Sequence, residues 1–470
     1  MNTKIADVVA GRAGLAGVQW ALLGAPARRA LRHALRTLLE DPGLLGPCGL
    51  RRAKYKPGRH LTAYYDVHLR SKDGTSDGVR PIEVTWVPEG TDDPRGPLPD
   101  RLHMQAEALH RGLAAPFQQL MAELPSWGMR VQVAPIDITF QQLVRVCDPA
   151  YAHDMLARAA TSHERAGAAA LAPRYAVTSI RYRPGQRHVL RYDPLDGAEH
   201  PGACAAVFAK IYNSDKGART FHVATRVADW LLTHGGSIRS ARPWAYLPDD
   251  NVVLYPCVSG TPLSSLLRRP TVAHLRRAGA ALQAVHRMPT TLVDLQAHAF
   301  AAEVKAIARA AEHVEALLPA VSAQIHALLE RARELHERLP QDPPGFAYGD
   351  FKADHLWITP DGITLMDFDT CYLADQAIDV GKFLADLRWW YDGYGHAGVE
   401  GAQEHFLAGY ADNVPHAFLA RARLYEALVL VKSTVRRVRL FDRDWAPRTA
   451  RLVDQAEAVL NKLQATIERR

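Results

Sequence analysis

The chain has 470 residues, 48% of them hydrophobic, which is enough for about three domain-sized units with sizeable cores. Its net charge is +7, and its five cysteines are scattered, odd in number and without the spacing of a metal site, which excludes a disulfide scaffold and favours free thiols in the cytoplasm. No apolar run approaches the ~20 residues of a membrane span, so we expect no membrane partner.

The N-terminal third is expected to contain helices followed by a β-rich stretch. Leucines recur at helical spacing from Leu31 onward, which predicts a helical segment that docks on the protein or forms a homodimer. Residues 54–66 alternate polar and apolar side chains around the turn Pro57-Gly58, which predicts a β-hairpin. An alanine-rich helix near residues 152–172 is expected to follow it.

A second hairpin is predicted further along the chain. Residues 180–192 alternate in the same way around Pro184-Gly185. The apolar, β-prone run that follows contains Lys210, and a lysine in such a run costs free energy to bury unless an anion meets it. Alternatively, Lys210 lies on the wet face of an edge strand. A further strand is predicted to end near Tyr255 to Val258.

The two hairpin sequences resemble each other. Residues 54–66 align without gaps against residues 181–193 and share the aromatic, Pro-Gly, Tyr and Asp positions. Continuing the alignment places Glu83 at the position of Lys210. The sequence therefore predicts a degenerate internal repeat, although basic hairpins with Pro-Gly turns also recur by chance.

The chemistry is carried by two carboxylates that are separated by a third predicted hairpin. Asp350 lies in Tyr348-Gly-Asp-Phe-Lys-Ala-Asp-His355, and Asp367 follows two β-prone runs joined by the turn Pro360-Asp-Gly362. This layout suits phosphoryl transfer, in which one carboxylate accepts the proton of an attacking hydroxyl and the other holds the Mg²⁺ that bridges the phosphates of ATP. Isolated Gly-Asp and Asp-Phe-Asp sequences are also ordinary turn residues, but here their order and spacing favour the catalytic interpretation.

At these residues the chain resembles the aminoglycoside phosphotransferase and choline kinase family, whose signature is His-Gly-Asp, four residues, Asn, and an Asp after a hairpin. The resemblance covers about residues 172–400. It implies that Asp350 is the catalytic base, that Asp367 is the main metal ligand and that His355 takes the position of the second ligand. It also implies that Asp379 braces the catalytic loop.

The resemblance implies an α+β, protein-kinase-like fold with a β-rich small lobe and a mostly helical large lobe, preceded by an additional α+β domain. In such a fold Lys210 would bind the nucleotide phosphates, and adenine would dock near Tyr255 and Val258. The hairpin residues Arg183, Gly185 and Arg187 would cover the phosphates. The expected segments are a helical segment 1–35, a degenerate small-lobe-like domain 36–150, a connecting helix 151–171, a nucleotide-binding lobe 172–258 and a catalytic lobe 259–470.

The chain departs from the family pattern at three places. Tyr348 replaces the leading His, a packing residue, whereas His355 replaces a metal-binding Asn and suits softer ions than Mg²⁺. The stretch 213–234 contains no Glu to pair with Lys210, and Asp229 is an alternative partner with a shorter reach. These departures motivate a rival prediction, a catalytically inactive, nucleotide-binding scaffold.

We expect an ATP-dependent phosphotransferase that uses Mg²⁺ or Mn²⁺ and phosphorylates a hydroxyl of a sugar, an aminocyclitol or an amino alcohol. Residues 342–412 contain thirteen acidic side chains against three basic ones, which favours an acceptor that carries amines. Trp389 and its aromatic neighbours are candidates for the acceptor pocket. A kinase-fold enzyme that modifies a protein is a further alternative. No nucleic-acid module accompanies the basic stretch 432–443, so we expect no nucleic-acid partner.

Overall fold

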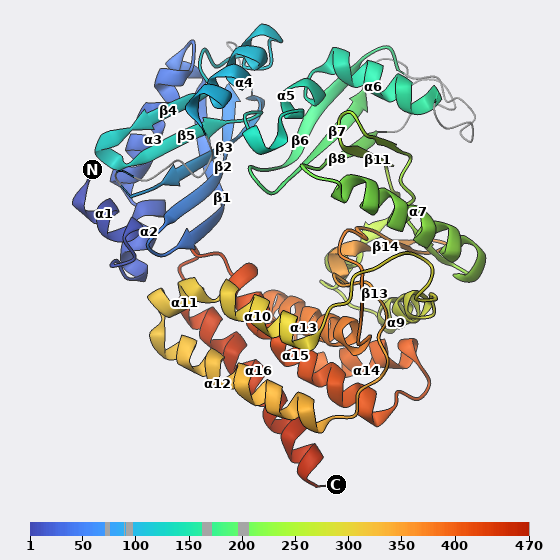
Figure 1. Ribbon diagram of the computed structural model, residues 1–470. Helices are drawn as coiled ribbons and strands as arrows, with labels where there is room; N and C mark the ends of the chain where they lie inside the picture. Colours follow the sequence, from blue (N-terminus) through green and yellow to red (C-terminus); the bar gives the residue numbers. More distant parts are fainter. Residues whose placement is uncertain (71–75, 89, 91–96, 162–171, 196–205, 470) are drawn as a thin grey trace. The chain divides into compact units, whose positions relative to one another are not determined.

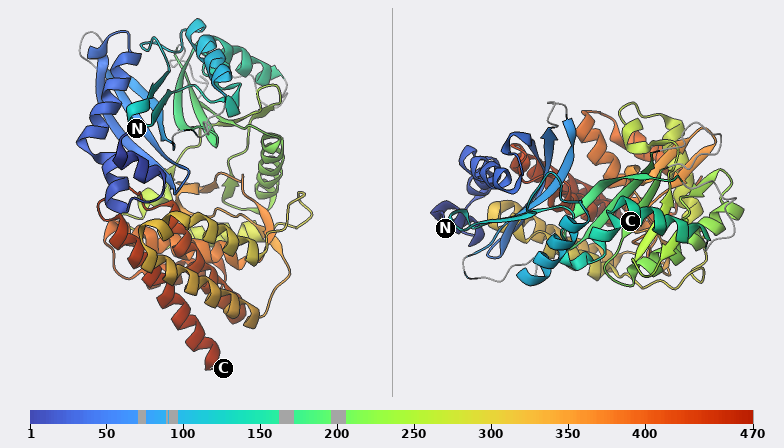
Figure 2. Two further views of the ribbon diagram at one scale, coloured as in Figure 1. Left: turned by 60° about the vertical axis from the view of Figure 1, so that its left-hand side comes forward. Right: turned by 90° about the horizontal axis from the view of Figure 1, so that it is seen from above.

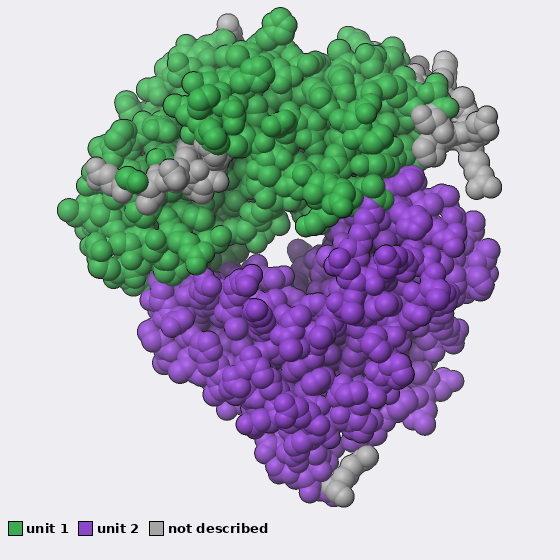
Figure 3. Space-filling model, in the orientation of Figure 1, with its two compact units in different colours: residues 1–218, 244–257, 439–443 green, residues 219–243, 258–438, 444–470 purple. Residues whose placement is uncertain are grey.

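The computed structural model describes residues 1–70, 76–88, 90, 97–161, 172–195 and 206–469. They form two compact units (Figure 3). Unit 1 comprises residues 1–218, 244–257 and 439–443, and unit 2 comprises residues 219–243, 258–438 and 444–470. The chain therefore passes between the units several times. The five domain segments expected from the sequence, 1–35, 36–150, 151–171, 172–258 and 259–470, stay a prediction. No helix in the described residues is long and apolar enough to cross a membrane.

The first half of unit 1 is an antiparallel sheet with helices on one face (Figure 1). The expected hairpin forms at the Pro-Gly turn, where Gly58 adopts a φ of +72° that a side chain would strain. Alternate residues of its second strand, such as Leu61, Ala63 and Val67, are buried. The helices are α1 (Thr3–Val9), α2 (Leu15–Leu23) and α3 (Ala25–Leu38), and the sheet order is β1 (Leu45–Lys56), β2 (His60–Arg70), β3 (Ser76–Trp86), β5 (Met129–Val133) and β4 (Met121–Leu124).

The second half of unit 1 contains another five-stranded antiparallel sheet, seen from further directions in Figure 2. Its hydrophobic core contains inward-facing residues of the strands, such as Tyr192, and residues of the two helices that precede the strands, such as Leu156. The expected connecting helix ends at Thr161, and its predicted continuation to residue 172 lies outside the described residues. The helices are α4 (Leu98–His110), α5 (Leu143–Val146) and α6 (Pro149–Thr161), and the sheet order is β6 (Tyr175–Arg183), β7 (Arg187–Pro194), β8 (Val207–Ile211), β11 (Val252–Pro256) and β10 (Ala245–Leu247). Helix α7 (Lys216–His234), which follows β8 in the chain, belongs to unit 2 from residue 219 onward.

The two sheets have the same topology. In each, a Pro-Gly hairpin is followed by a third strand, a helix, an edge strand and a fifth strand inserted between the third and fourth. The shared tyrosines also play matching parts. Tyr65 donates its hydroxyl to the carbonyl of Leu22 in α2, and Tyr192 donates to that of Val146 in α5. The repeat therefore extends from the hairpin to the whole sheet and to its anchoring helices.

The expected correspondence of Glu83 with Lys210 is wrong by two residues. Lys210 pairs across the ladder with Val189, whose equivalent in the first hairpin is Thr62. Thr62 pairs with Thr85, and Glu83 pairs with Tyr64. A slip of two residues keeps every side chain on its own face of the sheet, so the hydrophobic pattern allows it.

Unit 2 is mostly helical, with two small sheets. Residues 300–338 form three helices. The last of them starts at Pro319, because proline disfavours helical geometry at the residue before it and suits the first position of a helix. The helices are α8 (Leu263–Leu266), α9 (Val272–His286), α10 (Phe300–Ala310), α11 (Glu312–Leu317), α12 (Pro319–Arg338), α13 (Ala377–Tyr394), α14 (Val399–Tyr410), α15 (His416–Arg436) and α16 (Trp445–Glu468). The sheets have the orders β12 (Thr261–Pro262), β14 (Leu356–Thr359), β15 (Gly362–Leu365), β9 (Ile238–Ser240), and β13 (Gly345–Ala347), β16 (Tyr372–Ala374).

Helix α13 is held tightly against α15, which fixes the polar residues on its other side. At Gly381 a side chain would collide with the backbone of α15, since an added Cβ would lie 2.4 Å from the carbonyl oxygen of Ala422. The apolar face of this helix, including Phe383 and Leu384, is fully buried.

Candidate active site

The loop that carries Asp350 is braced from beneath by a buried carboxylate. The side chain of Asp379, in the first turn of α13, accepts hydrogen bonds from the backbone N–H groups of Tyr348 at 2.6 Å and Gly349 at 2.8 Å. It also contacts Nε2 of His286 at 3.2 Å, while the hydroxyl of Tyr410 lies 2.8 Å from the other ring nitrogen. Asp379 is fully buried. The contacts agree with the expected bracing role of Asp379 and with a structural role for His286.

Asp350 follows this brace and faces two lysines. Nζ of Lys382 lies 2.6 Å from one carboxylate oxygen, and Nζ of Lys352 lies 2.7 Å from the other. Burial by itself would raise the pKa of Asp350, but the charges of Lys382, His355 and Lys352 outweigh burial and hold this pKa well below its usual range. Asp350 is therefore ionised at neutral pH.

The hairpin expected after Asp350 forms from β14 and β15 and delivers Asp367. The strands pair from Leu356 with Leu365 to Thr359 with Gly362. The hydroxyl of Tyr348 donates to the carbonyl of Met366, and the backbone of Met366 bonds to that of His355. Asp367 has a φ of +69°, a conformation that costs free energy for a residue with a side chain and is maintained only by surrounding contacts.

His355 lies between the two carboxylates. Its Nδ1 is 3.1 Å from the backbone carbonyl of Asp350 and 3.7 Å from that residue's carboxylate, and its Nε2 is 3.5 Å from the carboxylate of Asp367. Because a carbonyl oxygen only accepts, Nδ1 carries the proton, and in the neutral ring Nε2 keeps a lone pair directed at Asp367. The structure thus brings together Asp350, His355 and Asp367, as the sequence predicted.

These residues fit a divalent cation that is shared with a nucleotide. No group of three or more His, Cys, Asp or Glu side chains in the described residues is arranged as a complete metal cage. Mg²⁺ is commonly held by one or two carboxylates together with substrate phosphates and water, so a complete protein cage is not required. Asp367 offers the oxygen ligand, and Nε2 of His355 offers a nitrogen ligand that suits softer ions than Mg²⁺.

The candidate nucleotide residues belong to unit 1, except Val258, which belongs to unit 2. Lys210 lies on central strand β8, not on an edge strand, with its ammonium group 5.2 Å from the ring centre of Tyr255. The alternative that placed Lys210 on an edge strand is therefore wrong. Asp229, the suggested partner of Lys210, forms an ion pair with Arg242 in unit 2.

Gly185 differs from its expected role. Its backbone N–H donates to the carboxylate of Asp137 at 2.8 Å, and the same oxygen lies 2.8 Å from Nε2 of His188. In this structure that N–H is occupied, and an adjacent carboxylate repels phosphate. Arg183 and Arg187 are cross-strand partners at the end of this hairpin.

Two lysines and an aspartate were missed by the sequence analysis. Lys352 and Lys382 contact Asp350, and Asp386 accepts a hydrogen bond from the backbone of Ala353 at 2.8 Å. Lys382 and Asp386 lie three and seven residues after the bracing aspartate on one helix face. This spacing is the signal that could have identified them.

Arginines from the last helices balance much of the acidic stretch 342–412. Arg421 pairs with Asp342 and Asp375, and Arg437 pairs with Asp386. A further ion pair joins Arg448 to Asp392. The count made along the sequence ignored these partners, so the charge of the stretch does not by itself select a cationic acceptor.

The ring of Trp389 is contacted by the guanidinium groups of two arginines. The guanidinium of Arg437 lies 4.4 Å from its ring centre and that of Arg448 lies 4.3 Å away. These contacts give Trp389 a structural role in joining α13 to the last helices, in place of the expected contact with an acceptor.

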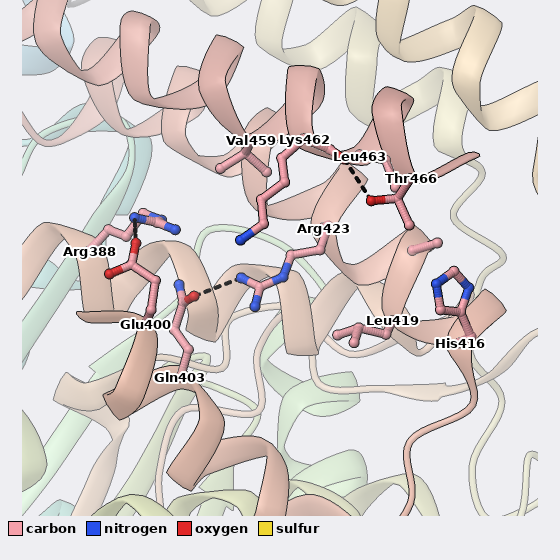
Figure 4. A pocket seen from close by; sticks show the side chains of 11 residues that line it. Arg388, Glu400, Gln403, His416, Leu419, Arg423, Val459, Lys462, Leu463 and Thr466 are labelled. Carbon is pink, nitrogen blue, oxygen red and sulfur yellow. Dashed lines mark hydrogen bonds and ion pairs between the residues drawn. The ribbon is translucent and has the colours of Figure 1, made fainter. Parts of the chain in front are cut away.

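A cavity of about 240 Å³ in unit 2 contains none of the predicted site residues. It lies among α13, α14, α15 and α16, and the side chains of Arg423 and Lys462 extend into it (Figure 4). Arg423 and Arg388 both pair with the buried carboxylate of Glu426. Arg388 and Arg423 therefore serve the packing of the helices through Glu426.

Comparison with known proteins shows what the part of the chain that carries this site is similar to. A sequence model described as the phosphotransferase enzyme family matches residues 198–425. No curated protein sequence matches the chain. Among solved structures, a choline/ethanolamine kinase family protein from Mesorhizobium loti is similar with 15% identity and a TM-score of 0.45, over 67% of this chain and 99% of that one.

Two further structures are similar at this level. A thermostable mutant of aminoglycoside phosphotransferase APH(4)-Ia has 13% identity and a TM-score of 0.44, over 62% of this chain and 95% of that one. Choline kinase from Cryptosporidium parvum Iowa II has 12% identity and a TM-score of 0.42, over 62% and 90% of the two chains. The family match confirms the expected resemblance and, with the strand order of the second sheet, the expected α+β, kinase-like fold.

Proposed function

Because residues 198–425 match the model of the phosphotransferase enzyme family, we propose that the protein is an ATP-dependent kinase that phosphorylates a hydroxyl of a small molecule in the cytoplasm. The observation that carries the proposal is the pair Asp350 and Asp367, joined through His355 on a braced loop and hairpin. This pair supplies a proton acceptor and a metal ligand, the two anionic groups that phosphoryl transfer to an alcohol requires.

Asp350 acts in this mechanism by orienting the acceptor hydroxyl. A carboxylate with a lowered pKa is a weak base, but the transition state of phosphoryl transfer is loose and the hydroxyl proton leaves late. Asp350 would accept a hydrogen bond from the hydroxyl and take its proton as the new P–O bond forms. Lys352 and Lys382 hold the carboxylate in position and keep it ionised until then.

The remaining candidates would bind the nucleotide. Lys210 would neutralise charge on the phosphates, Arg183 and Arg187 would add positive charge at the hairpin, and Tyr255 and Val258 would contact the base. Asp367 and His355 would hold the divalent cation. When bound, such an ion neutralises the charge that develops on the transferred phosphoryl group.

For the acceptor we propose a sugar, an aminocyclitol or an amino alcohol. The family match supports this proposal, and the names of similar structures include choline/ethanolamine kinases and aminoglycoside phosphotransferases. The charge balance of unit 2 adds no preference for amines, so a neutral sugar is an equal candidate.

The test is ATP consumption with Mg²⁺ or Mn²⁺ across a panel of aminoglycosides, amino alcohols and free sugars. We expect turnover that depends on one acceptor and falls by at least about 10³-fold in Asp350→Asn. Asp354→Asn, an exposed carboxylate on the same loop, is the matched control and should retain activity. Equal turnover in wild type and Asp350→Asn would contradict the assignment of Asp350.

A second candidate function is a nucleotide-binding scaffold without transfer activity. It is favoured by the occupied N–H of Gly185 and by the imidazole at position 355. ATP binding in a thermal-shift assay, with no transfer of label from γ-phosphate to any small molecule or protein, would support it. Label on a protein would instead support a protein-modifying enzyme.

A further inference from the structure

The tip of the second hairpin lies against the first sheet, within unit 1. Nζ of Lys54 on β1 donates to the side chain of Gln186 at 2.7 Å, and the amide of Gln186 lies 3.5 Å from the hydroxyl of Tyr64 on β2. The neighbouring residue Gly185 is bound by Asp137, which follows β5. The two halves of the repeat therefore meet at this tip through direct polar contacts.

The tip continues the face of the second sheet that carries Lys210. Along the ladder, Arg181 pairs with Val189 and Val189 pairs with Lys210, so these three side chains form one row on one face. Arg183 lies two residues beyond Arg181 on the same strand and pairs with Arg187. Because side chains alternate along a strand at about 3.3 Å per residue, Arg183 lies on the Lys210 face, roughly 7 Å nearer the tip.

The first sheet presents a polar face to the same tip. Arg52 pairs with Tyr64, and Tyr64 pairs with Glu83, while Lys54 pairs with Thr62 in the adjacent row. The side chains of Tyr64, Glu83 and Thr62 are buried. A buried polar face is costly unless its groups bind something, and its basic members lie at the edge strand next to Gln186.

Positive charge accumulates where the two faces meet. Burial, and then the charges of Arg52, Lys56 and Arg183, lower the pKa of Lys54 to about 8, against an opposing effect of Glu83. Burial, together with neighbouring arginines that include Arg52, lowers the pKa of Arg183 to about 9. The carboxylates of Glu83 and Asp137 are too few to offset these cations.

We propose that Lys54 and Arg183 form an anion site at the junction of the two hairpins and that this site binds a phosphate group. The site gives the N-terminal domain a part in ligand binding through Lys54. An ammonium and a guanidinium that approach each other from two sheets are relieved when an anion lies between them. The phosphate has two candidate sources, the nucleotide held by Lys210 or a separate phosphorylated ligand. The first of these rests on the proposed function and the second does not.

The test uses the full chain and pyrophosphate as the probe, measured by calorimetry at low salt. We expect the double variant Lys54→Gln/Arg183→Gln to weaken pyrophosphate binding by about 100-fold, which is about tenfold for each charge-assisted contact. Arg51→Gln is the matched control, because it removes one cation from the same strand, where Arg51 pairs with Asp66. Its affinity should stay within about twofold of wild type. Equal affinity in wild type and the double variant overturns the proposal. The proposal also fails if wild type does not bind pyrophosphate at about 10 mM, a concentration at which two charged contacts should already give binding.

Competition with ATP separates the two sources. If the phosphate belongs to the nucleotide, pyrophosphate competes with ATP and the double variant loses affinity for both. If it belongs to a separate ligand, pyrophosphate binds to the ATP complex and only its own affinity falls. Repeating the titration in Asp350→Asn distinguishes this proposal from the proposed function, since a failure of phosphoryl transfer leaves pyrophosphate binding intact.

The melting temperature of the ligand-free chain distinguishes a variant that has lost the anion site from one that is misfolded. Removing two mutually repelling, half-buried cations should raise the melting temperature, whereas a purely structural role would lower it. A lower melting temperature in the single variant Lys54→Gln, with unchanged pyrophosphate affinity, counts against the site. A higher melting temperature with weaker affinity supports it.

Discussion

The two sheets of unit 1 share a strand order but differ in the chemistry of one face. In the second sheet, Lys210 lies between Val189 and Val253 and places an ammonium group on this face. In the first sheet, the equivalent position is Thr85, whose hydroxyl contacts Glu83 at 3.3 Å. Topology is therefore set by the hairpins and the buried tyrosines, whereas binding chemistry depends on single residues of this face.

The largest effect should distinguish the two equivalent positions. Lys210→Met should lower kcat on the order of 10²-fold, because it removes a charge that the proposed mechanism places on the phosphates. Thr85→Val should leave kcat within about twofold and cost about 1 kcal/mol of stability through the lost contact with Glu83. Steady-state kinetics and urea unfolding of both variants measure these effects. A large loss of kcat in Thr85→Val would give the first sheet a catalytic part and break the comparison.

The contact between the sheets should have the next largest effect. Asp137→Ala would leave the N–H of Gly185, the ring of His188 and the N–H of Thr139 without their acceptor. We expect a loss of about 2–4 kcal/mol in the free energy of unfolding, because the buried ring of His188 would lose its acceptor and two backbone N–H groups would lose theirs. Urea unfolding measures this, and Asp249→Ala, an exposed carboxylate, is the control. A loss below about 0.5 kcal/mol would show that the hairpin tip does not depend on the first sheet.

The pH dependence should separate Lys54 from its equivalent, Arg181, which stays charged throughout the range. The pKa of Lys54 is about 8 in the folded chain and 10.5 normally, so between these values the unfolded chain binds more protons. The free energy of unfolding should therefore rise with pH by about 2 kcal/mol between pH 8 and 10.5. Denaturant unfolding at several pH values should show this rise in wild type and its loss in Lys54→Gln. The exposed control Lys462→Gln should keep the rise, and an identical pH profile in all three would contradict the assignment.

The smallest effect concerns the shared aromatic position. Tyr55 donates its hydroxyl to the carbonyl of Val8, and its equivalent Tyr182 donates to that of Ile136. Tyr55→Phe and Tyr182→Phe should each cost about 1 kcal/mol, and the double variant should cost about their sum. Thermal unfolding measures both. A cost above about 2 kcal/mol at one position and none at the other would argue against equivalent anchoring of the two sheets.

The sequence by itself determined the local structure of this protein and the identity of its catalytic hairpin. The three hairpins, the turn at Gly58 and the helix that contains Leu31 follow from alternation, turn residues and helical spacing, which depend on neighbours in the chain. Asp350, His355 and Asp367 could be grouped for the same reason, since a single short hairpin separates them.

Only the tertiary structure decided how distant side chains meet. Three sets of contacts join residues that lie 32 or more positions apart in the chain. They are the ion pair of Lys382 with Asp350, the ion pairs of Arg421 and Arg448 with the acidic stretch, and the hydrogen bond from Gly185 to Asp137. The structure matches Lys210 with Thr85, two residues from the predicted Glu83. Cross-strand register is set by pairing between strands, and loops of different length satisfy the same alternation. Such contacts depend on packing between elements, which no local pattern encodes.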